Sequence, residues 1–392
     1  MKKLITTAVI TLCIAGIVPA QDITISGEIK TGLFWYDNDI DTLRHETGTF
    51  IHNNEDTTPA NLLSRGGYGA YIDSPARFRL NFQVENQNVG VKFRFETTKW
   101  PHPSTTRDTI FWGYAFAYGY FWDNQIKISG GKMGDSPWGS GGPEMWRELD
   151  TAIGMRFEFI PSFIPFIKPG QLNLGFVLND MNASIDGALQ TGLLYSSFGD
   201  ILQESVLGLA YTHDYFLLRL AYRLDSKIDD DKGGKFIYRV EERTIQKFLP
   251  GFQIWANGAF ENIGTEELVA TNWLYIQYAP EWFTAQIRVG YDLFGESNIF
   301  YVRAGFYYNL FNNLLIPGIA FEYAQDSGIG RRGSDDYLRW YIEPQLKLNL
   351  GNGTYVAFVY RYQDDYERWN ISQTTTVNSK TSWINIRVVF TF

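Results

Sequence analysis

Six basic residues are spaced so that their charges could gather on one surface. These residues are Arg77, Arg79, Lys92, Arg94, Lys127 and Lys132. The first two are two positions apart, as are the third and fourth, and a short polar turn separates the two pairs. Side chains two positions apart on a β-strand share a face, so a tight hairpin would bring these four cations together. Like charges held side by side repel, so the cluster indicates a surface whose electric field is used.

The segment Gly134–Asp150 carries the opposite charge and is rich in Gly, Pro and Trp. Its carboxylates are Asp135, Glu144, Glu148 and Asp150. If the segment folds back toward the basic residues, the opposed charges would create a transverse field that filters solutes by size and charge. An exposed, external loop is the alternative interpretation.

No pattern in the sequence is typical of a catalytic or metal site. His45-Glu46 lacks the second histidine of a His-Glu-x-x-His motif, and Gly130–Gly134 has the wrong order and spacing for a phosphate-binding loop. The four histidines are scattered along the chain. We therefore expect no catalytic residue, no metal and no cofactor.

The elements that must position the charged residues are short amphipathic strands. In Ala76–Glu85, apolar residues alternate with polar ones at a period of two, and Val89–Thr97 repeats the pattern. Similar segments follow to the end of the chain, with tight turns alternating with longer polar gaps. Successive strands of such a barrel must run in opposite directions, and the candidate strands break this rule somewhere between Gly134 and Asp225. Ala188–Ser197 is one of the candidate strands in that region. The pattern predicts an all-β fold, a closed antiparallel up-and-down barrel of 18 strands with 16 as the alternative.

Two further local predictions follow from composition. The polar stretch Asp37–Gly67 is predicted to be an external loop. In Ile110–Trp122, bulky aromatics alternate with Gly and Ala, and we expect the small residues to face inward, where Gly134–Asp150 could pack against them. Basic residues also fall at inward positions of later strands. They are Arg219, Arg223, Arg288, Arg303, Arg339 and Arg361, with Glu158, Glu322 and Glu343 among the interleaved carboxylates.

The last segment, Thr381–Phe392, is an amphipathic strand that runs to the chain end without a turn. A final strand ending in Phe392, with Phe390 two residues earlier, resembles the closing strand of Gram-negative porin-type outer-membrane β-barrels. That resemblance implies that Phe390 and Phe392 form the signal read by the barrel-assembly machinery. It also implies that Gly134–Asp150, in its position after the fifth strand, is the external loop that folds into a porin and narrows it.

Residues 1–20 have the pattern of a cleaved secretory signal peptide. Lys2 and Lys3 precede a short apolar core, and Val18-Pro19-Ala20 supplies the small residues that signal peptidase reads. The single cysteine, Cys13, lies inside this segment, so we expect residues 21–392 to form the barrel without disulfides. Aromatics make up 17% of the chain, which fits apolar residues spread over every second strand position. The formal net charge of −9 argues against nucleic acid as a partner.

These observations predict a bacterial outer-membrane channel for passive diffusion of small hydrophilic solutes and ions through a charged aqueous lumen. The expected partners are outer-membrane lipid, the assembly machinery and the solutes, with a homotrimer as one possible assembly. Three alternatives stay open at this point. The charged inward residues are ordinary lumen lining, or the barrel is an adhesin or structural protein acting through its long loops, or it is an outer-membrane hydrolase.

Overall fold

The computed structural model describes thirteen stretches of the chain, and they are almost entirely β-strand. They are residues 22–44, 49–61, 77–86, 88–97, 110–133, 136–139, 152–179, 205–223, 233–263, 268–294, 297–327, 336–369 and 375–392. The strands are β1 (Asp22–Arg44), β2 (Thr49–Asn61), β3 (Arg77–Asn86), β4 (Val89–Thr97), β5 (Ile110–Phe121), β6 (Ile126–Met133), β7 (Ala152–Phe159), β8 (Leu172–Asn179), β9 (Val206–Thr212), β10 (Phe216–Arg223), β11 (Gly234–Glu242), β12 (Phe252–Ile263), β13 (Val269–Tyr278), β14 (Phe283–Phe294), β15 (Ser297–Tyr308), β16 (Leu315–Ser327), β17 (Asp336–Gly351), β18 (Thr354–Trp369) and β19 (Thr375–Thr391). No helix in these stretches is long and apolar enough to cross a membrane.

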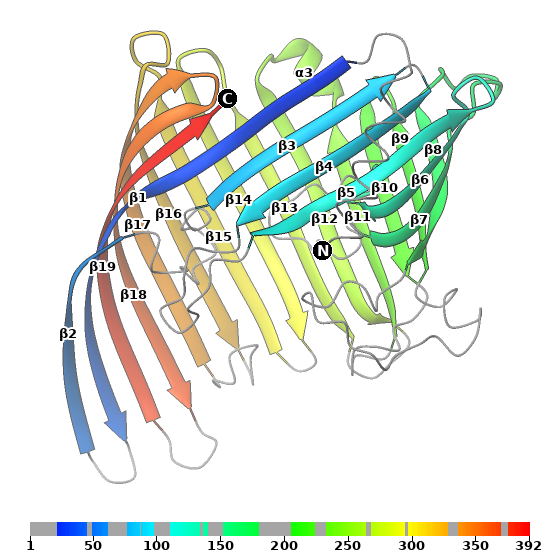
Figure 1. Cartoon of the computed structure of the whole chain (residues 1–392). Helices are drawn as coiled ribbons and strands as arrows, with labels where there is room; N and C mark the ends of the chain where they lie inside the picture. Colours follow the sequence, from blue (N-terminus) through cyan, green and yellow to red (C-terminus); the bar gives the residue numbers. More distant parts are fainter. Residues whose placement is uncertain are drawn as a thin grey trace.

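Of the nineteen strands in the described stretches, eighteen (β1 and β3 to β19) close into an antiparallel barrel, as predicted (Figure 1). From β3 to β19 each strand pairs with its successor, and β1 pairs with both β3 and β19. The chain end completes the closure, because the amides of Gly27 and Phe392 each donate to the other residue's carbonyl oxygen, at 2.8 and 3.1 Å. Closure leaves neither β1 nor β19 as a bare edge there, which is what a sheet in lipid requires.

Strand β1 is long enough to pair with two strands placed end to end. Its first part, Asp22–Lys30, pairs with β3, and its second part pairs with β2 from Leu33 to Arg44. The prediction that Asp37–Gly67 forms a loop is therefore wrong for residues 37–44 and 49–61, which are strand. In Figure 1, β1, β2, β18 and β19 extend at the lower left beyond the other strands.

Direct pairing of β8 with β9 resolves the inconsistent alternation noted in the sequence. Leu172 lies opposite Tyr211, and the register continues to the pair Val177–Val206. No strand can intervene between the two, so the barrel closes without the candidate strand Ala188–Ser197. That segment itself lies outside the described residues.

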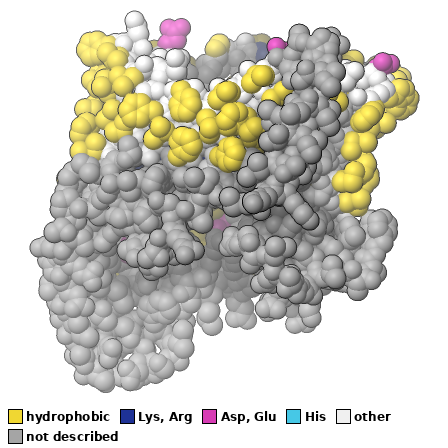
Figure 2. Space-filling view, viewed as in Figure 1, with side chains coloured by type: hydrophobic (Ala, Val, Ile, Leu, Met, Phe, Trp, Pro, Cys, Tyr) yellow, Lys and Arg dark blue, Asp and Glu magenta, His cyan; other side chains and the backbone are white. Residues whose placement is uncertain are grey.

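The two faces of the barrel differ in chemistry. Large apolar side chains stand exposed on the outer face, and Figure 2 shows yellow patches of them across the upper part of the face in view. Examples are Ile25, Met155, Phe176, Leu274, Ile319, Leu346, Phe358 and Ile384. The alternate positions carry charged or polar side chains that are buried, among them Arg156, Glu158, Glu322 and Arg361. An apolar outside and a polar inside is the arrangement of barrels that span an outer membrane.

Tight connections join the strands at the end of the barrel where Phe392 lies. Between β17 and β18, Asn352 and Gly353 both take left-handed φ values of 50° and 76°, which Asn and Gly tolerate better than other residues. The β7–β8 connection is tied to the β5–β6 turn, because the Ile160 amide donates to the Gln125 carbonyl at 2.7 Å. In the same connection Lys168 hydrogen-bonds Asp214 at 2.7 Å, and this bond holds the pKa of the Asp214 carboxyl below its ordinary value.

Candidate functional site on the inner face

The predicted basic hairpin forms, but its cations have partners. Arg79 lies on the inner face and its Nε is 2.5 Å from an oxygen of Glu96 on β4. Arg94 donates from Nε to Asn81 Oδ1 at 2.6 Å, and its guanidinium lies 4.6 Å from the Tyr114 ring centroid. These contacts spread the positive charge over carboxylate, amide and aromatic groups, so the cluster is less concentrated than its spacing alone suggests.

The other members of the basic set separate. Arg77 lies opposite Lys30 of β1, and its side chain is outside what the structure describes. Lys92 and Lys127 both approach Tyr118, with Nζ atoms 5.6 and 4.9 Å from the ring centroid. The interpretation of Lys132 as an inward residue is wrong. It is five positions from Lys127, and strand alternation therefore puts it on the outward face.

Strand β5 turns its aromatic side chains inward, contrary to the expectation that its small residues would face the interior. Phe116 and Tyr118 are 3% and 6% exposed, whereas Ala117 between them is exposed on the outside. Their rings pack on the inner face with Met133 of β6. Lys92 and Lys127 interact with the Tyr118 ring, and their charged ends could not lie in the outer apolar band, so this face of β5 points inward.

Residues Ser136–Gly139, just after β6, lie inside the barrel against the nearby wall formed by β8 and β9. Trp138 is fully buried, and its indole lies over two glycines, Gly175 of β8 and Gly208 of β9. A Cβ atom at Gly208 would come within 1.9 Å of the indole, and one at Gly175 within 2.7 Å. The absence of side chains at these two positions therefore creates the space that Trp138 fills.

Hydrogen bonds fix this inward segment to a buried polar network. The Trp138 Nε1–H donates to Asn173 Oδ1 at 3.0 Å, and Asn173 Nδ2 donates to Glu158 Oε2 at 2.8 Å. The other oxygen of Glu158 accepts from Arg156 Nε at 2.8 Å and lies 3.7 Å from Lys127 Nζ. A buried carboxylate needs such partners, because an unpaired buried charge is strongly destabilising. The network thus couples the position of Trp138 to the charges of β6 and β7.

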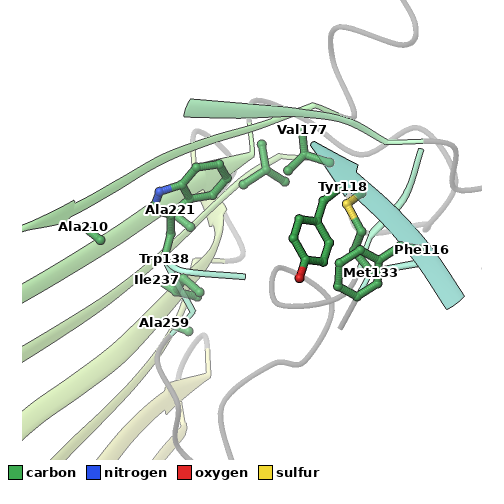
Figure 3. Close-up of a cluster of buried hydrophobic side chains, with 10 residues drawn as sticks. Phe116, Tyr118, Met133, Trp138, Val177, Ala210, Ala221, Ile237 and Ala259 are labelled. Carbon is green, nitrogen blue, oxygen red and sulfur yellow. The ribbon is translucent and has the colours of Figure 1, made fainter. Parts of the chain in front are cut away.

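An apolar cluster surrounds Trp138 on the inner face of β5–β12 (Figure 3). Figure 3 shows the indole beside Ala210, Ala221, Ile237 and Ala259, with Tyr118 and Met133 on the other side of the cluster. Small residues on β9 to β12 provide room for the ring. Apolar contacts of this kind exclude water locally around the indole.

From β10 to β19 the inner face is rich in arginine. Its described cations are Arg219, Arg223, Lys235, Arg239, Arg288, Arg303, Arg339, Lys347, Arg361 and Arg387, and its described carboxylates are Glu241, Glu261, Asp292, Glu322, Glu343 and Asp365. Several are paired, such as Lys235 with Glu261 at 3.4 Å. Arg361 pairs with Glu343 and lies 3.9 Å from the Tyr341 ring centroid. The cations outnumber the carboxylates, so this wall carries a net positive charge.

The predicted acidic residues Asp135, Glu144, Glu148 and Asp150 lie outside the described residues. So does most of the segment Gly134–Asp150, of which the structure describes Ser136–Gly139. The Arg219 guanidinium donates to the Gly139 carbonyl at 3.3 Å, so the backbone at this point also touches the arginine-rich wall. Within the described stretches, no group of three or more His, Asp or Glu side chains is arranged to hold a metal.

The closed barrel, its apolar outer band and its charged inner face together have the architecture of a membrane-spanning β-barrel. No protein-family model and no curated protein matches the sequence. Among solved structures, the chain is similar to Pseudomonas aeruginosa OpdQ, with 11% identity, a TM-score of 0.49 and coverage of 95% of this chain and 99% of that one. It is also similar to the outer membrane channel DcaP of Acinetobacter baumannii, with 8% identity, a TM-score of 0.48 and coverage of 95% of this chain and 98% of that one. A third similar structure is the anion-selective porin from Comamonas acidovorans, with 11% identity, a TM-score of 0.47 and coverage of 95% of this chain and 100% of that one. Identities of this size carry no information about solutes.

Proposed function

We propose that this protein is a channel for passive diffusion of small hydrophilic solutes and ions across the bacterial outer membrane. The observation that carries the proposal is the closed 18-strand barrel whose inward positions hold charged side chains. A barrel of this size is wide enough to enclose water, which solvates such charges. Passive diffusion requires only this charged lining and an opening at each end of the barrel.

The channel favours anions over cations. The support is the arginine-rich wall of β10–β19, whose cations outnumber its carboxylates. Charges that line a low-dielectric passage focus their field on ions within it, and this field raises the local anion concentration. The effect weakens as salt screens the charges, so the preference is largest at low ionic strength.

The inward segment narrows the passage. Trp138 and Gly139 are buried against the inner wall, and the chain continues from there into residues 140–151. We retain the proposal that this segment places the carboxylates Asp135, Glu144, Glu148 and Asp150 opposite the basic residues Arg77, Arg79, Lys92 and Arg94. Deleting residues 139–144 should then raise the conductance, because the narrowest part of the passage widens.

The proposal includes how the chain is exported and assembled. Residues 1–20 direct the chain out of the cytoplasm and are removed, and residues 21–392 form the barrel. Phe390 and Phe392 are exposed on the outer side of the final strand, where the assembly machinery can contact them. Pulse labelling with a signal-peptidase inhibitor tests the first step, since accumulation of the longer precursor is expected.

Conductance decides between this function and an adhesin or structural role. The extension of β1, β2, β18 and β19 beyond the other strands is the feature that favours a surface role. Purified, refolded protein in a planar bilayer should give discrete current steps, with a reversal potential in a salt gradient that shows anion preference. Folded protein without current steps or solute flux in liposomes contradicts the channel and leaves the surface role. Cross-linking of the same preparation distinguishes monomer from homotrimer.

A further inference from the structure

Two arginines face each other directly on neighbouring strands of the inner wall. Arg288 of β14 lies opposite Arg303 of β15 in the antiparallel register, and both occupy inward, partly exposed positions. Like charges placed directly opposite in a sheet are destabilising. A pair kept in this arrangement indicates a use for the combined positive charge.

The carboxylates on neighbouring positions have hydrogen-bond partners of their own. Glu322 of β16 lies opposite Arg303. One of its oxygens accepts from Arg339 Nη2 at 2.6 Å, and the other accepts from the Tyr341 hydroxyl at 3.2 Å. Asp292 accepts from the Tyr301 hydroxyl at 2.9 Å. These bonds show that the neighbouring carboxylates also engage groups other than the arginine pair.

The surroundings hold the first arginine in a fixed orientation. The Arg288 guanidinium lies 4.1 Å from the Trp273 ring centroid. The centroids of the Trp273 and Tyr301 rings are in turn 3.7 Å apart. Gly290 makes this packing possible, because a Cβ there would come within 1.6 Å of the Tyr301 ring. A guanidinium restrained on an aromatic face loses less entropy when it binds an oxyanion.

Neutral hydrogen-bonding groups border the pair on one side. The Tyr275 side chain lies opposite Arg288 in the register, and its hydroxyl is 2.7 Å from Gln286 Oε1. The amide of Gln286 is in turn 3.5 Å from the Tyr307 hydroxyl. Such groups can contact a bound solute without adding a charge that repels it.

We propose that Arg288 and Arg303 form a saturable binding site for small oxyanions within the passage. The planar fork of each guanidinium matches the oxygens of a carboxylate or a phosphate group. The proposal rests on the channel function above and deepens it, since it names the class of solute that the passage retains. Binding must be weak enough for release, so we expect saturation at millimolar concentrations rather than tight binding.

Single-channel recording with potassium propionate or potassium phosphate as the only salt tests the site. Wild-type conductance should saturate as either salt is raised, while conductance in potassium chloride stays closer to linear. In R288Q/R303Q the half-saturating concentration of the oxyanion should rise at least tenfold. R288K/R303K keeps the charge without the planar fork, and its half-saturating concentration should lie between those of the wild type and R288Q/R303Q.

A matched variant separates a specific site from the general field of the wall. K347Q/R387Q removes two inner-wall cations that flank Ala357, away from the proposed site. It should lower anion selectivity yet keep the half-saturating concentration within about twofold of wild type. Equal loss of saturation in both double variants, or unchanged saturation in R288Q/R303Q, overturns the site. Saturation with only one of the two salts keeps it and identifies the oxyanion. A wild-type protein that gives no current contradicts the channel function itself, which is a separate result.

Discussion

Trp138 occupies the space that a side chain at residue 208 would need. The Cβ of any larger residue at Gly208 would lie 1.9 Å from the indole Cδ2 atom. The two residues belong to segments far apart in the sequence, and they meet because β8 and β9 pair directly. This contact is what holds the described part of the inward segment against the wall.

Variants at this contact should enlarge the passage. Trp138→Ala removes the ring and the hydrogen bond to Asn173, and loss of a buried Trp costs about 3–5 kcal/mol of local packing. Gly208→Val leaves the tryptophan intact but closes its space. Both should increase single-channel conductance and open-channel noise. Trp138→Phe keeps most of the ring and should change conductance less. Wild-type conductance in both disruptive variants, with normal folding, would show that the segment does not set the aperture.

Closure of the barrel should depend on the fit between Gly27 and Phe392. A Cβ at Gly27 would come within 2.3 Å of the Phe392 ring, and the ring itself is 60% exposed on the outer side. Phe392→Ser should lower the folded, heat-modifiable fraction in cells, because the strand loses its aromatic end. Gly27→Leu should do the same by displacing the ring.

Phe392→Tyr is the control for this closure, since it keeps an aromatic ring at the chain end. It should fold nearly as well as the wild type. A normal folded fraction for Phe392→Ser, measured by gel mobility with and without heating, would remove the assembly role assigned to this residue.

Adjacent positions on β17 should respond oppositely to a new charge. Leu346 is 42% exposed on the outer face, and its neighbour Gln345 faces inward. Leu346→Arg should reduce unfolding free energy by about 2–4 kcal/mol if the position lies near the bilayer midplane. Gln345→Arg should cost much less. Denaturant titration of liposome-refolded protein measures both, and equal costs would mean that the faces are assigned wrongly.

Neutralising the basic hairpin should move selectivity toward cations. R79Q/R94Q removes two positive charges and leaves Glu96 without its 2.5 Å partner, so the local field becomes negative. The reversal potential in a tenfold salt gradient should shift accordingly, and the shift should shrink at high salt. R79K/R94K keeps the charge and should behave like the wild type. An unchanged reversal potential in the first variant would make these residues structural.

Period-two alternation was enough to predict the barrel and most of its faces. It placed Arg79 and Arg94 on one side of their hairpin, and it placed Arg288 and Arg303 on inward positions. Alternation does not say which of two alternating sets of side chains faces inward when either could do so. In β5 the two sets are the aromatic residues and the small residues, and for this reason the prediction reversed its faces. Lys132 was grouped by proximity although its spacing from Lys127 is odd. The space for Trp138 depends on Gly175 and Gly208, two strand glycines whose meaning appears only when register is known.

The pairing of β1 with β19 also determines when the barrel can be finished. These strands come from the two ends of the chain, so the last ladder cannot form until the final residues are available. Closing so long a loop adds little to the equilibrium cost, because each doubling of loop length costs only about 0.6 kcal/mol. The delay is kinetic, since contacts between distant residues form slowly. Until then the free edges of β1 and β19 stay available to other strands, and the time spent in that state sets the opportunity for aggregation.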